Sequence, residues 1–141
     1  MMNKKVLCNL LLFFAGGLGY SVLEILWRGF THWTMFLLGG VCYLLIIQAA
    51  SVCKGRLPLW FCCFCSAAAV TMLEFATGCL VNLLLGWNVW DYRGQPLNLL
   101  GQVCIGFTAL WFLLSIPVAE LGLWMKDKIR QSLDRIMGAA E

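Results

Sequence analysis

Four long apolar stretches constrain this chain of 141 residues more than any other feature. They cover residues 6–27, 33–52, 59–85 and 98–124. Each reaches the roughly 20 mostly apolar residues that a membrane-spanning helix needs. Only 12% of the residues are charged, whereas soluble domains carry about 25%. The sequence therefore predicts an all-α fold, an integral membrane bundle of four transmembrane helices that occupies residues 1–125.

The segments between these stretches contain residues that interrupt helices. They are Gly29, Gly55, Pro58, Gly94 and Pro96. The first apolar run is too long for the core of a signal peptide, and no small-residue cleavage site follows it. We therefore expect it to be retained as the first membrane helix.

Positive charge is distributed unevenly between the two ends of the predicted helices. Eight basic residues fall on the side that carries both chain ends, namely Lys4, Lys5, Lys54, Arg56, Lys126, Lys128, Arg130 and Arg135. Only Arg28 and Arg93 fall on the other side. Because cytoplasmic loops carry an excess of Lys and Arg, we expect a multi-pass protein of the cell membrane with both termini in the cytoplasm.

Residues 126–141 differ from the rest of the chain because they mix charged and apolar residues. Ile129, Leu133, Ile136 and Met137 recur at helical spacing, with charges largely between them. This pattern predicts a cytoplasmic amphipathic C-terminal helix at the membrane surface. It would anchor the end of the fourth span or dock a cytoplasmic partner.

Two glutamates lie within the apolar stretches, where a carboxylate is costly and marks a candidate functional site. Glu24 lies four residues before Arg28, so the two side chains are within reach on one helix face. Glu74 has no basic residue within helical reach, so it must be protonated or meet a cation from elsewhere, with Arg28 and His32 as the candidates. Leu-Leu-Gly-x-Val-Cys sequences follow both acids, which suggests a tandem repeat of two helical hairpins.

Most remaining polar side chains gather toward the same side as the two glutamates. The candidate ligand-binding residues are Glu24, Arg28, His32, Glu74, Asn82, Trp90, Asp91, Asn98 and Gln102. Structural alternatives stay open. They are a Glu24–Arg28 pair that only neutralises itself, amides that form hydrogen bonds between helices, and tryptophans that form an interfacial belt.

Eight cysteines include a Cys62-x-x-Cys65 spacing, which also occurs in redox proteins. Most of them lie within apolar runs, and a buried cysteine behaves as a small hydrophobic residue. We therefore interpret them as structural. The sequence predicts no metal site and no cofactor.

Several stretches of the chain resemble a known family. They are Gly19–Glu24, Arg28–Met35, Gly86–Tyr92 and Pro96–Cys104. They are similar to the small bacterial membrane proteins described as "putative ABC-transporter type IV", or CmpB-like, and the similarity extends over nearly the whole chain apart from its C-terminal helix. The resemblance implies a multi-pass membrane protein with a permease-like role.

Together these features favour a transporter, or a transporter subunit, with an outward-facing polar pocket for a small polar ligand or a lipid headgroup. Glu74 would be its central ionisable group. The alternatives are an intramembrane enzyme that acts on lipid or isoprenoid substrates, with Glu74 and His32 as acid–base candidates, and a structural or regulatory membrane subunit. The expected partners are the lipid bilayer and either a second copy of the chain or a membrane or ATPase subunit, with no nucleic acid.

Overall fold

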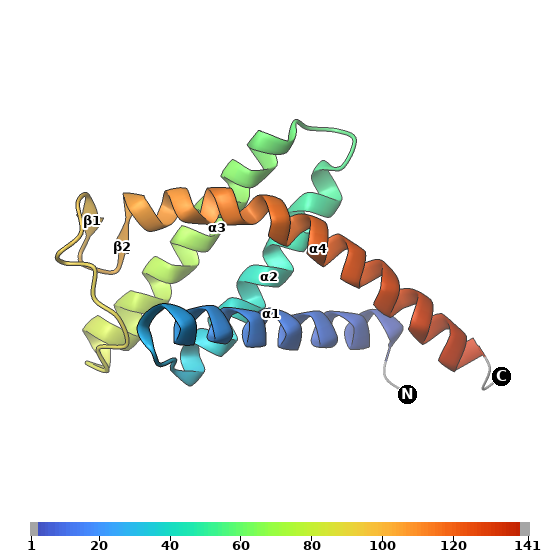
Figure 1. Cartoon of the computed structure of the whole chain (residues 1–141), viewed down its shortest axis with the longest axis horizontal. Helices are drawn as coiled ribbons and strands as arrows, with labels where there is room; N and C mark the ends of the chain where they lie inside the picture. The colour runs from blue at the N-terminus through green and yellow to red at the C-terminus, as the bar shows by residue number, and fades with distance from the viewer. Residues whose placement is uncertain (1–2, 139–141) are drawn as a thin grey trace.

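The computed structural model describes residues 3–138 of the chain. Four long helices dominate it, and each is long and apolar enough to cross a membrane, which confirms the predicted four-helix membrane bundle. In chain order the elements are α1 (Lys4–Arg28), α2 (Trp33–Cys53), α3 (Leu59–Gly78), η1 (Cys79–Leu84), β1 (Asn98–Leu99), β2 (Val103–Cys104) and α4 (Ile105–Gly138) (Figure 1).

Local sequence explains where the first two helices begin and end. The side chain of Asn3 accepts a hydrogen bond from the backbone N–H of Lys5 at 2.9 Å, which satisfies one of the free donors at the start of α1. Gly29 ends α1 in the left-handed conformation, with φ of +82°, which glycine adopts without steric cost. His32 caps α2 through a ring nitrogen that accepts from the N–H of Thr34 at 3.4 Å.

The fourth helix begins later than the sequence predicts. We expected it to start at Asn98, but α4 starts at Ile105. Residues 98–104 instead form a two-stranded antiparallel sheet in which Asn98 pairs with Cys104 and Leu99 with Val103. The turn between the strands places Leu100 and Gly101 at positive φ, +52° and +69°, which a right-handed helix cannot contain.

The separate amphipathic C-terminal helix is not supported. Residues 126–138 continue α4 without a break, and the last helix is apolar enough to be a membrane span. The reason is tertiary packing. Leu133 is buried in a cluster with Cys8 and Leu12 of α1, so this part of α4 covers the start of α1. The division of the chain at residue 125 stays a prediction.

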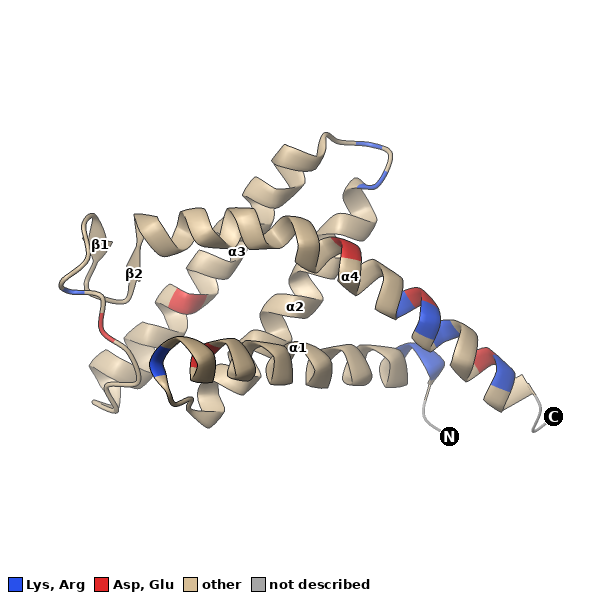
Figure 2. Ribbon diagram, in the orientation of Figure 1, with Lys and Arg blue, Asp and Glu red and all other residues tan. Residues whose placement is uncertain are grey.

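The bundle has two distinct ends. We call the end with residues 29–32 and 85–104 the loop end, and the end with the start of α1, the last part of α4 and the turn at residues 54–58 the terminal end. Figure 2 shows Lys and Arg gathered in that turn, at the start of α1 and along the last part of α4. In Figure 1, α1 and α4 come together toward the terminal end and lie apart toward the loop end, while α2 and α3 run across them.

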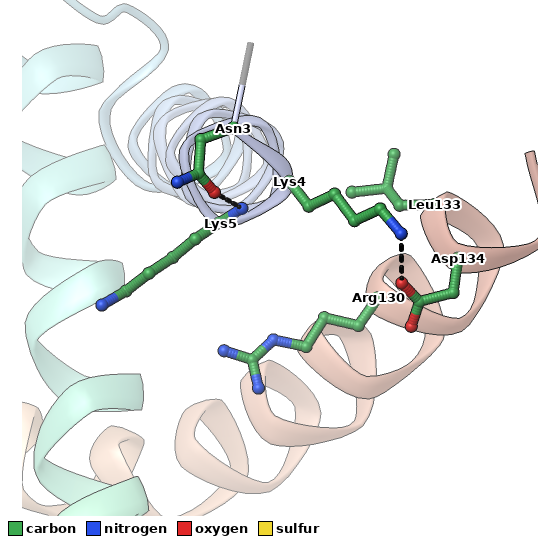
Figure 3. Close-up of a pocket in the computed structure, with 6 residues that line it drawn as sticks. All are labelled: Asn3, Lys4, Lys5, Arg130, Leu133 and Asp134. Carbon is green, nitrogen blue, oxygen red and sulfur yellow. Dashed lines mark hydrogen bonds and ion pairs between the residues drawn. The ribbon is translucent and has the colours of Figure 1, made fainter. Parts of the chain in front are cut away.

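Polar contacts join α1, α2 and α4 at the terminal end. Lys4 Nζ of α1 lies 3.0 Å from Asp134 Oδ1 of α4, across a hollow of about 290 Å³ that Figure 3 shows from close by. Lys126 Nζ donates a hydrogen bond to Ser51 Oγ of α2 at 3.0 Å. Because the Lys4–Asp134 pair is exposed to solvent, it contributes little to stability. The buried cluster around Leu133 is the stronger link.

Candidate functional site

A cavity of about 740 Å³ lies at the loop end. We call it the loop-end cavity. Its walls come from α1, α2, α3, α4 and the loop before β1, and the lining residues are Tyr20, Leu23, Glu24, Trp27, Arg28, Met35, Glu74, Trp90, Asp91, Tyr92, Gln95, Gly106, Phe107, Leu110, Trp111 and Leu114. Its lining is mostly apolar and carries a few polar groups, as is usual for small-molecule sites of this size.

Glu74 is the most deeply buried charged side chain in the lining, with 4% of its surface exposed. Glu74 lies on α3, which continues into η1 and ends at Leu84. Ten residues separate Glu74 from that end, which is roughly 15 Å along the helix axis. Among the described residues its carboxylate has no ion pair and no side-chain hydrogen bond of good geometry. The indole N–H of Trp111 interacts with Glu74. The indole nitrogen nevertheless has no partner at the distance and angle of a hydrogen bond among the described residues.

Glu24 and Arg28 form the ion pair that their spacing predicts. Arg28 Nη2 lies 2.7 Å from Glu24 Oε1, and Thr31 Oγ1 donates a hydrogen bond to Glu24 Oε2 at 2.6 Å. Arg28 Nη1 also donates to the backbone oxygen of Val89 at 2.7 Å, and its guanidinium lies 4.4 Å from the ring centre of Phe30. Both charges therefore have partners within the loop end.

Two aromatic stacks line the loop-end cavity. Tyr20 of α1 stacks on Trp111 of α4 with ring centres 5.6 Å apart and planes 14° apart. Tyr92 of the loop stacks on Phe107 of α4 at 4.6 Å and 17°. Burial, and next the nearby Glu74 carboxylate, raise the pKa of Tyr92. Its hydroxyl therefore stays protonated and available as a donor at neutral pH.

Hydrogen bonds of two buried side-chain amides hold the loop between η1 and β1 in place. Asn82 Nδ2 donates to Gln102 Oε1 at 2.8 Å, and Asn82 Oδ1 accepts from the N–H of Val89 at 2.6 Å. Trp90 Nε1 donates to the backbone oxygen of Gln102 at 2.8 Å. These bonds hold Trp90 in the cavity lining, while Asn82 and Gln102 bond to each other and lie outside that lining.

The structure brings five of the nine predicted site residues to the loop-end cavity. They are Glu24, Arg28, Glu74, Trp90 and Asp91. Asp91 pairs with Arg93, whose Nε lies 3.2 Å from Asp91 Oδ2.

The other four predicted residues have positions outside the lining. His32 caps α2 and contacts the rings of Trp33 and Trp87. Asn98 bonds to the backbone oxygens of Arg93 and Gln95 within the loop. Asn82 and Gln102 pair with each other. The prediction that residues 98–104 belong to the fourth helix is wrong, so Asn98 and Gln102 both precede α4.

Among the lining residues that sequence reasoning missed are the four rings that stack in pairs, Tyr20, Tyr92, Phe107 and Trp111. A signal was present for the one on α1, since Tyr20 precedes Glu24 by four residues and helical periodicity places it on the same face. The rings on α4 follow the same rule with respect to each other, being four residues apart. Their position opposite α1 depends on how the helices pack.

Comparison with known proteins assigns the chain to a family. The family described as "Putative ABC-transporter type IV" matches residues 6–139, nearly the whole chain. The chain belongs to this family. Searches of curated proteins and of solved structures found no match. The family membership and the four apolar helices together make the chain a multi-pass membrane protein of transporter-like type.

Proposed function

We propose that this chain is a transporter, or a transporter subunit, that binds a small polar ligand or a lipid headgroup in the loop-end cavity. The observation that carries the proposal is the Glu74 carboxylate, buried without an ion-pair partner among the described residues and facing an apolar cavity of about 740 Å³. A polar group is costly to bury unless something in the protein or in a ligand pairs with it. The family membership supports a transport role.

The charge distribution supports an orientation for this site. Eight of the ten basic residues lie at the terminal end, so the positive-inside tendency favours both termini in the cytoplasm. The loop-end cavity then opens toward the outer leaflet of the cell membrane. Because the chain is short for a complete translocation pathway, we propose that it works as a homodimer or with a membrane or ATPase partner.

Adding a bulky side chain to the cavity lining tests ligand binding. A Cβ added at Gly106, which lines the cavity, has no heavy atom within 4 Å, so Gly106→Phe adds bulk there without a backbone clash. Gly19→Phe is the matched control, because its added Cβ also meets open space while Gly19 lies outside the lining. Native mass spectrometry of the full chain, titrated with membrane lipids, should detect bound lipid for the wild type and for Gly19→Phe but not for Gly106→Phe. Equal lipid binding by all three would contradict the proposal.

A further inference from the structure

The charges that line the loop-end cavity do not balance. Three of the lining side chains are acidic, Glu24, Glu74 and Asp91, and one is basic, Arg28. Glu24 is paired with Arg28, and Asp91 is paired with Arg93 outside the lining. Among residues 3–138, Glu74 is thus the acidic group in the lining that has no positive partner.

The two basic residues that the sequence offers to Glu74 have other partners in the structure. Arg28 is held at one place by Glu24, by the backbone oxygen of Val89 and by the ring of Phe30. His32 is bonded to Thr34 at the start of α2 and lies outside the lining. Neither of these two residues therefore pairs with Glu74.

The cavity walls are suited to an organic cation. Six aromatic residues line it, Tyr20, Trp27, Trp90, Tyr92, Phe107 and Trp111. The faces of such rings attract cations. In the two stacked pairs, Tyr20 with Trp111 and Tyr92 with Phe107, one face of each ring is already covered by its neighbour. An anion in the same place would meet the carboxylate of Glu74 without compensation. Both the rings and the carboxylate therefore favour positive charge.

The rim of the cavity favours a ligand that also has an apolar part. Trp27 on α1 is 81% exposed and Leu110 on α4 is 44% exposed, and both line the cavity. In a membrane-spanning chain, exposed apolar side chains on these helices face acyl chains. A bound molecule can therefore place its charge beside Glu74 while its hydrocarbon portion extends between α1 and α4 into the lipid.

From these observations we infer that the loop-end cavity selects a hydrophobic organic cation, an amine or quaternary ammonium on an apolar body, whose charge is paired by Glu74. This inference rests on the proposed function and names the ligand class of the same site. Two sources supply such chemistry, an amine-containing lipid headgroup and a free amphiphilic cation.

Two probes of the same shape and opposite charge test the selectivity. Tetraphenylphosphonium and tetraphenylborate are titrated by calorimetry into the full chain in an uncharged maltoside detergent. We expect the phosphonium to bind at least tenfold more tightly than the borate. We also expect Glu74→Gln to weaken phosphonium binding at least tenfold, and Glu74→Asp, which keeps the charge, to preserve the preference for the cation. Glu120→Gln on α4, an exposed acid outside the lining, is the control and should change the affinity less than twofold.

The outcomes separate this inference from the proposed function. If Glu74→Gln leaves phosphonium binding unchanged, or if the borate binds as tightly, the inference is overturned. Even if the inference is overturned in this way, the proposed function still holds as long as Gly106→Phe blocks lipid binding. Competition of the phosphonium by added phosphatidylethanolamine supports the inference with a lipid headgroup as the source, and absence of competition supports it with a free cation as the source.

Discussion

At the scale of single residues, Asn82 and Glu74 lie on the same α3–η1 segment and have opposite surroundings. Asn82 is buried with both ends of its amide bonded, one to Gln102 and one to Val89. Glu74 is buried with no ion pair among the described residues and faces the cavity. The sequence placed both in one ligand site. Asn82 instead holds the loop in place, and Glu74 remains the candidate for binding.

We expect Asn82→Ala to destabilise the protein by roughly 2 kcal/mol or more. The substitution leaves the N–H of Val89 and the side-chain oxygen of Gln102 without partners, and a buried polar group left unpaired costs about 1–3 kcal/mol. Chemical unfolding in detergent, followed by circular dichroism, measures the loss.

Gln48→Ala is the control for Asn82→Ala. It also removes an amide from a membrane helix, but Gln48 is exposed and has no side-chain hydrogen bond in the described part of the chain. It should change stability by less than about 0.5 kcal/mol. If both variants lost the same free energy of unfolding, the buried hydrogen bonds of Asn82 would make no special contribution to stability.

At the scale of elements, α1 and α2 pack through glycines. An added Cβ at Gly17 would lie 2.6 Å from the backbone oxygen of Phe36. On the facing helix, an added Cβ at Gly40 would lie 2.8 Å from the backbone oxygen of Phe13. Small residues allow membrane helices to approach this closely. The same packing sets the position of Tyr20, which an added Cβ at Gly39 would meet, so it also shapes the cavity.

We expect Gly17→Ala to lower stability by about 1–3 kcal/mol, because a backbone oxygen cannot move aside as a side chain can. The measurement is the midpoint of thermal unfolding in detergent. Gly19→Ala on the same helix is the control, since an added Cβ there meets nothing within 4 Å. It should be neutral or stabilising, because alanine is favoured over glycine in helices by about 1 kcal/mol. A loss in both variants would point to the backbone of α1 rather than to helix packing.

At the scale of the whole molecule, the start of α1 and the last part of α4 meet. The last part of α4 covers the start of α1, where Leu133 is 9% exposed within its buried cluster. Ile136 lies three residues further along the same helix and is 69% exposed. The contact closes the terminal end, while α1 and α4 lie apart at the loop end (Figure 1).

We expect Leu133→Ala to destabilise the protein by about 2 kcal/mol or more, the usual cost of truncating a buried leucine. Ile136→Ala removes a side chain of the same size from an exposed position and should cost less than about 0.5 kcal/mol. Thermal unfolding of both variants in the same detergent gives the comparison. If Ile136→Ala cost as much as Leu133→Ala, the segment would behave as the surface helix that the sequence suggested.

The sequence predicts best what depends on short-range composition. Apolar run length predicted the four spans, because a bilayer sets the length of a helix. Helical spacing predicted the Glu24–Arg28 pair, because residues four apart lie on one face. The loop between α3 and α4 was harder, since the strand pair of Asn98 with Cys104 depends on three residues at positive φ, Leu97, Leu100 and Gly101, two of which are leucines.

By itself, the sequence determined that the chain spans the membrane four times, which charges lie at each end, and that Glu74 has no partner on its own helix. Only the tertiary structure decided which polar groups share a cavity. In the folded chain Asn82 bonds to Gln102, and His32 bonds to Thr34 at the start of α2. Helix packing also brings the rings of Tyr20 and Trp111 together in the cavity that Glu74 lines. The physical reason is that the side chains available to pair with a buried carboxylate come from the neighbouring helices. The sequence of one helix therefore cannot show whether Glu74 is paired.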